Sequence, residues 1–173
     1  MHARPALQSR TSPRAGRRAL PAWAWVAGGG IVLGLADLGI AAGYWFLHSG
    51  TDPIRIPQAI AGWVLGREHA RAGGMATALA GAALYCAIVG AMVAGYLRLA
   101  SRWPRVHAHV ADAGVVYGLA MYVLLFRIVL PLFVAGEPHA LPMSWTAACL
   151  AAYAGIGVGC ALIARVAHRV THR

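Results

Sequence analysis

Four long apolar segments, separated by short polar stretches, dominate the pattern of hydrophobic and polar positions along the chain. They cover residues 22–47, 74–97, 111–134 and 143–164. At about 1.5 Å per residue, each is long enough to cross a hydrocarbon core of about 30 Å as a helix. The pattern therefore predicts an all-α, polytopic membrane protein with four transmembrane helices, in a single domain over residues 21–173. Residues 1–20 carry five Arg and no acidic residue, and we expect them to form a disordered basic cytoplasmic tail.

A further segment, residues 54–70, lies between the first and second spans, and its helical part of about 13 residues is too short to cross a bilayer. Pro57 suits the first turn of a helix, and Ile56, Ile60 and Trp63 fall on one side of that helix. The segment is therefore predicted to be an additional amphipathic helix on the outer surface, with a re-entrant segment as the alternative. Gln58 would be an unusual residue to leave in lipid, so we expect its side chain to face protein.

The basic residues lie at the ends of the apolar segments, so the formal net charge of +10 does not indicate a nucleic-acid partner. With the amino terminus inside, eleven Arg flank the spans on the inner side and only Arg55, Arg67 and Arg71 on the outer side. Both termini are therefore predicted to be cytoplasmic. All fifteen basic residues are Arg, and the chain is rich in Ala and Gly, which is typical of a GC-rich bacterial genome and predicts the bacterial inner membrane. The six Trp lie near span ends or in loops, as in an interfacial belt.

One acidic residue, Asp37, lies near the middle of the first span, where an unpartnered charge costs roughly 2.5–3.5 kcal/mol on insertion scales. On a helix it shares a face with Gly30 and Gly34, so we expect this face to point into the protein. A second pair, Gly39 and Gly43, falls on another side and predicts a second neighbouring helix. The glycine faces of the first and fourth spans are candidate surfaces for self-association: Gly30, Gly34, Gly155 and Gly159.

Arg127, in the third span, is the strongest candidate partner for Asp37. If both spans run outward, the two residues have similar depths, and an ion pair would offset much of the desolvation of each charge. A direct Asp37–Arg127 pair is one hypothesis. The alternative is that Arg127 extends to the outer surface.

Three tyrosines lie well inside the second and third spans: Tyr85, Tyr117 and Tyr122. Their hydroxyl groups need acceptors in a dry interior. A backbone carbonyl or Thr77 is the expected acceptor, with Asp37 as the alternative for one of them.

The sequence predicts no cofactor, metal or catalytic site. The outer histidines, His48, His69 and His139, lack short metal-ligand spacing, and no His lies inside a span as a bis-histidine haem requires. Cys149 and Cys160 are about 16 Å apart on one helix, beyond disulfide reach. An intramembrane enzyme would need a second acid, or Ser and His, at membrane depth.

Residues 27–135 resemble a group of small bacterial inner-membrane proteins that are similar in plan to the YagU-type family. The resemblance is carried by the motifs Gly-Leu-Ala-Asp (34–37), Arg-Ile-Pro-Gln-Ala-Ile-Ala-Gly (55–62), Gly-Gly-Met-Ala-Thr-Ala (73–78), Tyr96, Val-Tyr-Gly (116–118) and Val-Leu-Pro-Leu (129–132). It implies a four-helix inner-membrane fold and no particular activity. The chain departs from the pattern at Leu84-Tyr85-Cys86, where members tend to carry Leu-His-Phe, and at Arg127, in a usually neutral span.

These observations favour a non-enzymatic structural or accessory component of the membrane, whose partner is the lipid bilayer. The alternative function is a small-solute or proton permease with Asp37 and Arg127 in a polar intramembrane path.

Overall fold

The computed structural model describes residues 21–103, 106, 109–133 and 142–171. The elements of this part are α1 (Ala22–Ser49), α2 (Arg55–Leu65), α3 (Arg67–Ala72), α4 (Gly74–Arg102), α5 (Val110–Val123), the π-helical segment η2 (Leu124–Val129), α6 (Leu130–Phe133) and α7 (Met143–Thr171). The tail predicted over residues 1–20 lies outside the described residues.

Four helices of the described chain are long and apolar enough to cross a membrane: α1, α4, α7 and the continuous run from α5 through η2 into α6. This confirms the predicted all-α architecture with four spans. The helices α4 and α7 continue past the predicted ends, to Arg102 and Thr171. Long Arg side chains at helix ends keep their charge in water while their stems cover apolar surface, so a helix can extend beyond the hydrocarbon core.

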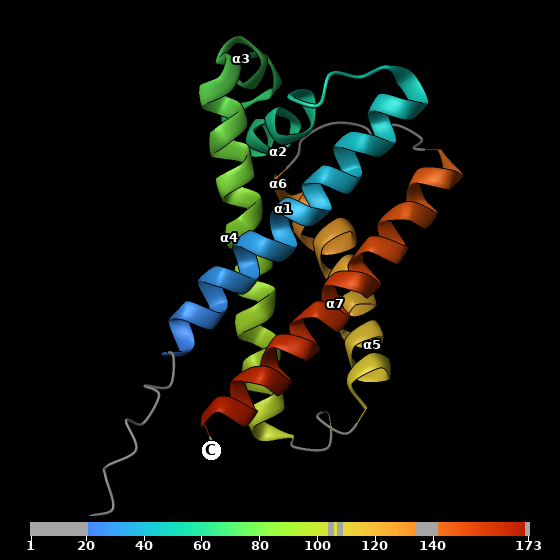
Figure 1. Ribbon diagram of the computed structural model, residues 1–173. Coiled ribbons are helices and arrows are strands. Elements are labelled where there is room, and N and C mark those ends of the chain that lie inside the picture. The colour runs from blue at the N-terminus through green and yellow to red at the C-terminus, as the bar shows by residue number, and fades with distance from the viewer. Residues whose placement is uncertain (1–20, 104–105, 107–108, 134–141, 172–173) are drawn as a thin grey trace, which may run out of the picture.

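The helices pack in two main pairs, α1 with α4 and α5 with α7, and α4 and α7 contact each other between these pairs. Figure 1 shows α1 and α7 crossing the bundle obliquely. The centre is formed by side chains of α4 and α7, of which Val89, Val93, Tyr96 and Cys160 are the largest that are fully buried. Large apolar side chains such as Val32 and Leu35 face outward on α1, as contact with acyl chains requires.

Glycines allow the closest helix contacts. A Cβ atom on Gly30 would lie 2.7 Å from the backbone oxygen of Cys86 and 2.8 Å from the Cα of Gly90, so α1 and α4 touch backbone to backbone here. Gly34 meets Cys86 in the same interface. The Gly30 and Gly34 face is therefore occupied within the chain. Of the other pair proposed for self-association, Gly159 meets Leu33 of α1, and Gly155 is exposed with no atom within 4 Å of its Cβ position.

The predicted second neighbour at Gly39 and Gly43 is wrong, because no other part of the described chain lies within 4 Å of a Cβ at either position. The helix α1 does have a second neighbour, α7, but it meets α7 through Leu33 and Gly159. A helical wheel shows which residues share a side, but it does not show which side is covered.

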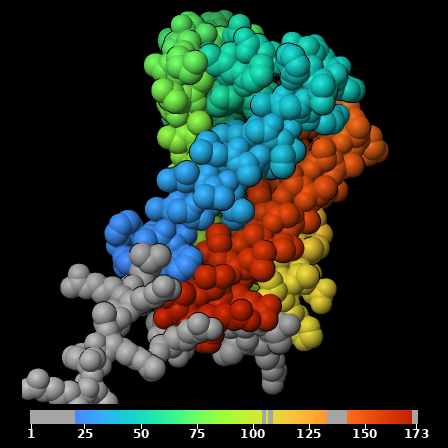
Figure 2. Space-filling model, viewed as in Figure 1, coloured from blue at the N-terminus to red at the C-terminus, as the bar shows by residue number. Residues whose placement is uncertain are grey.

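The short helices α2 and α3 cover one end of the bundle, and with the start of α4 they form a continuous cap (Figures 1 and 2). The helix α2 packs closely on α4, because a Cβ on Gly81 would collide with the backbone oxygen of Pro57. The buried residues of α2 are Gln58, Ile60 and Ala61. The additional helix predicted between the first two spans is thus present and has one face against protein.

Candidate functional site

A polar pair, Asp37 of α1 and Tyr85 of α4, lies near the middle of the bundle. The Tyr85 hydroxyl donates a hydrogen bond to Oδ2 of Asp37. Asp37 precedes the end of α1 by twelve residues and Tyr85 follows the start of α4 by eleven, so both lie about 17 Å from the capped end of their helices. The close contact of Gly34 with Cys86 brings this part of α1 against α4 and places the two side chains together.

The three tyrosines named from the sequence have different surroundings. The Tyr117 hydroxyl donates to the backbone oxygen of Met92 at 2.8 Å, as expected for a buried phenol. Tyr85, which is only 5% exposed, confirms the alternative, because its acceptor is Asp37. Tyr122 packs its ring against Phe126 and Tyr153, with centroid distances of 4.8 and 5.6 Å. Only Tyr85 of the three lines the cavity described below.

Arg127 lies on η2 and is exposed. Within the described chain, no ion pair joins Asp37 to Arg127. The hypothesis of a direct pair is therefore wrong for this structure. The physical reason is the order of packing: α1 lies against α4 and α7, whereas α5 lies against α7. The acid faces the phenol of α4 instead.

A cavity of about 520 Å³ extends from the capped end of the bundle to the polar pair. We call it the aromatic cavity. Its lining comes from α1, α2, Arg71 of α3, α4, α7, Phe126 of η2 and the loop before α2. Asp37, Tyr85 and Tyr153 form its deep end, because Tyr153 lies ten residues, about 15 Å, from the start of α7. The remaining walls are largely apolar, with Trp45, Trp63 and Trp145 as the largest side chains.

At the capped end of the bundle, α1 and α7 are joined by aromatic contacts that also form the wall of this cavity. The rings of Trp45 and Trp145 are 5.2 Å apart, and those of Tyr44 and Trp145 are 4.9 Å apart. The hydroxyl groups of Tyr44 and Ser144 are hydrogen-bonded at 2.7 Å. These Trp residues were predicted as part of an interfacial belt, and the structure gives two of them a contact across helices as well.

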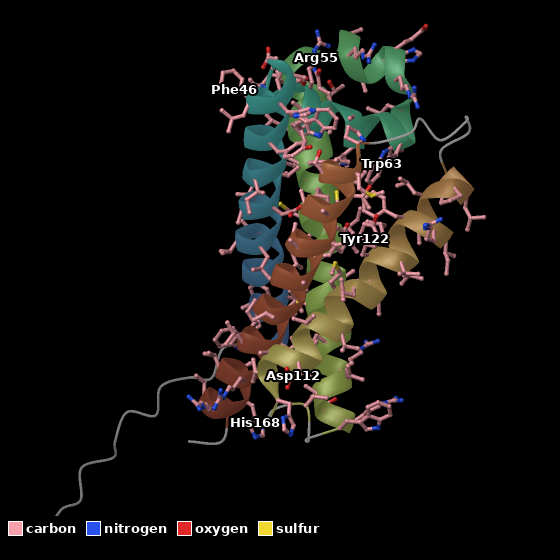
Figure 3. The ribbon with its side chains drawn as sticks, turned by 90° about the vertical axis from the view of Figure 1, so that its right-hand side faces the viewer. Phe46, Arg55, Trp63, Asp112, Tyr122 and His168 are labelled. Atoms are coloured by element: carbon pink, nitrogen blue, oxygen red, sulfur yellow. The ribbon has the colours of Figure 1, made fainter. Side chains whose placement is uncertain are left out.

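A second cavity of about 630 Å³ adjoins the first at the capped end and is lined by Thr51, Arg55, Gln58, Ala59, Gly62, Trp63, Arg67 and Arg71. We call it the arginine cleft. Arg55 and Arg71 line both cavities. Figure 3 shows Arg55 and Trp63 at this end, with Asp112 and His168 at the opposite end. Among the described residues, none of the three cleft arginines is in an ion pair.

Gln58 fixes one edge of the arginine cleft. Its side chain is 3% exposed, and its Nε2 donates a hydrogen bond to the backbone oxygen of Gly74 at 2.9 Å. Its Oε1 accepts a hydrogen bond from Nη1 of Arg55 at 3.4 Å. The expectation that Gln58 faces protein is confirmed, and the amide connects α2 to the start of α4 and orients Arg55.

Two parts of the site were missed from the sequence. Tyr153 carries the same signal as Tyr85, a phenol at membrane depth, and could have been named with it. Arg67 and Arg71 are four residues apart on α3, a spacing that puts them on one helix face. In the sequence analysis these two arginines served only to predict the orientation of the chain. Arg55 lies beside them in the arginine cleft because α2 packs against the same end of the bundle.

The four apolar helices define a multi-pass α-helical membrane protein, and the described residues line an open cavity between its helices. Comparison with protein-family models, curated proteins and solved structures found no match. The resemblance to the YagU-type plan therefore stays a prediction. Within the described part of the chain, no three His, Cys, Asp or Glu side chains gather as metal ligands, and His139 lies outside that part.

Proposed function

We propose that the chain is a non-enzymatic accessory component of a bacterial inner membrane that binds a small molecule in the aromatic cavity. The observation that supports this proposal is that one cavity extends from an arginine-lined opening to an intramembrane acid, Asp37. Its volume falls within the range of about 300–1,000 Å³ that is usual for small-molecule sites. Such sites combine apolar walls with a few placed polar groups, which here are Asp37, Tyr85 and Tyr153.

We place both termini in the cytoplasm, following the distribution of Arg along the chain. In this orientation the cap of α2 and α3 faces the periplasm, and so does the arginine cleft. The ligand would then enter from the periplasm or from the outer leaflet.

A small-solute or proton permease is the second candidate, and it is favoured by the position of Asp37 on the cavity. Intramembrane acids commonly mark substrate and proton paths. The described residues leave Arg127 out of that path, since it does not line the cavity. Transport would also require a second conformation, because the backbone contact of Gly30 with α4 closes the bundle on the far side of Asp37.

The native Cys149, which lines the aromatic cavity, gives a direct test. In the C86A/C160A variant, Cys149 is the only thiol of the chain. A membrane-impermeant methanethiosulfonate reagent added to intact spheroplasts should modify it, as measured by the mass of the purified protein. The matched control is C86A/C149A, which keeps only Cys160, fully buried between helices, and should stay unmodified. Modification of Cys149 only after denaturation would contradict a ligand cavity that opens to the periplasm.

Uptake by proteoliposomes separates the two candidates. A pH-dependent proton flux that is lost in D37N would favour the permease, and binding without flux would favour the accessory role.

A further inference from the structure

The two ends of the combined cavity differ in charge. Arg55, Arg67 and Arg71 surround the opening, and in the described chain none of them is neutralised by an ion pair. At the deep end the titratable groups are Asp37, Tyr85, Tyr153 and Cys149, and no basic residue lines that end. The site is therefore electropositive at its mouth and carries an acid at its floor.

The region between the two ends is apolar and aromatic. Trp45, Trp63 and Trp145 line it together with aliphatic side chains such as Leu38, Ile56 and Ile60. Transfer of an apolar group from water into such a region is favourable by roughly 25 cal/mol per Å² of buried apolar surface. A ligand that fills this volume must therefore have an apolar body.

We infer that the ligand is an anionic amphiphile, with a carboxylate or phosphate head at Arg55 and Arg71 and one apolar chain or ring system in the aromatic cavity. This inference rests on the proposed ligand-binding function and adds the chemical class of the ligand. The guanidinium group presents paired N–H donors that match the oxygen atoms of carboxylate and phosphate groups. Asp37 sets the orientation, because an acid at the floor disfavours an anionic head at the deep end.

The volume also limits the ligand. About 520 Å³ suits a drug-sized molecule and is too small for both acyl chains of a phospholipid. A single-chain lipid from the bilayer and a free organic acid from the periplasm share the required chemistry.

The three cavity tryptophans provide the readout for a test. In the W23F/W25F/W103F background, the remaining Trp residues are Trp45, Trp63 and Trp145, all of which line the aromatic cavity. This protein is placed in phosphatidylcholine nanodiscs and titrated with ω-bromo-octanoate, whose bromine quenches Trp fluorescence on contact. We expect saturable quenching by this acid and weaker quenching by the neutral ω-bromo-octanol.

Charge variants test whether the cleft arginines cause the preference for the acid over the alcohol. R55Q/R71Q should raise the half-saturating concentration of the acid about tenfold or more, and leave that of the alcohol unchanged. The matched control, R98Q/R102Q, removes two exposed arginines from the opposite end of α4 and should have no effect. Equal, saturable quenching by acid and alcohol, with no effect of R55Q/R71Q, would overturn the inference and leave the proposed function in place.

Failure of the proposed function has a different signature, in which neither brominated probe quenches saturably in any variant.

Where the acid does bind, a competition experiment identifies the source of the ligand. Displacement of ω-bromo-octanoate by lysophosphatidic acid incorporated into the nanodisc supports the inference with a membrane source. Displacement only by soluble octanoate supports it with an aqueous source.

Discussion

The hydroxyl of Tyr85 donates its hydrogen bond to the carboxylate of Asp37, and this contact joins α4 to α1. The intramembrane acid is thus satisfied by a phenol from the neighbouring span. A neutral donor satisfies an oxygen atom of Asp37 without placing a second charge in the low-dielectric interior. The pair also stands at the deep end of the aromatic cavity, so changes to it report on both packing and ligand binding.

The first prediction concerns this pair. Y85F should lower the free energy of unfolding by about 1–3 kcal/mol, because it leaves a buried carboxylate oxygen without its donor. D37N should also destabilise, because the amide oxygen of Asn is a weaker acceptor than a carboxylate. The D37N/Y85F double variant should lose less than the sum of the two single changes, since D37N weakens and Y85F removes the same hydrogen bond. Reversible unfolding in detergent micelles measures these differences.

The matched control for the pair is Y122F. Within the described chain no hydrogen bond of the Tyr122 hydroxyl is seen, so its loss should change stability little. Strict additivity of D37N and Y85F would contradict the contact.

The second prediction concerns Arg127. Because it is exposed on η2 and is not paired with Asp37, R127L should change the free energy of unfolding by less than about 0.5 kcal/mol. Its effect should add to that of D37N, as expected for separate sites. A coupling free energy above about 1 kcal/mol in the same unfolding assay would restore the ion pair predicted from sequence.

The third prediction compares two neighbouring glycines of α1. G30A should be strongly destabilising, by about 2 kcal/mol or more, because its methyl group would lie 2.7–2.9 Å from the backbone of Cys86 and Gly90. G28A is the matched control, since nothing lies within 4 Å of its Cβ position. It should be neutral, or stabilising by up to about 1 kcal/mol, through helix propensity. Thermal unfolding in detergent distinguishes them, and equal effects would argue against the α1–α4 contact.

The fourth prediction concerns Gln58. Q58L removes the donor to the backbone oxygen of Gly74 and should loosen α2 from α4. Hydrogen exchange followed by mass spectrometry should show faster exchange of the α2 amides, with α4 amides beyond Gly81 unchanged. V64A changes an exposed side chain of the same helix and should leave exchange unaffected. Unaltered exchange of α2 in Q58L would show that the amide does not hold the cap.

Sequence and structure agree best where local pattern decides the outcome. The four spans, the helix around Pro57 and the inward face of Gln58 follow from apolar length, proline position and the low solubility of an amide in lipid. The face shared by Gly30, Gly34 and Asp37 also follows from helical periodicity alone. These are properties of single segments, and they do not depend on which helices become neighbours.

The tertiary structure decided which faces meet. Asp37 and Arg127 have compatible depths in the sequence, but α7 lies between the helices that carry them, so the acid meets Tyr85 of α4. The cavity is also a tertiary property, since Arg55, Arg71, Trp45 and Trp145 come from four different helices. A sequence states which side chains a helix presents at each depth, whereas the order of packing around the bundle fixes their partners. That order depends on close contacts such as Gly30 with Gly90, between residues sixty positions apart in the chain.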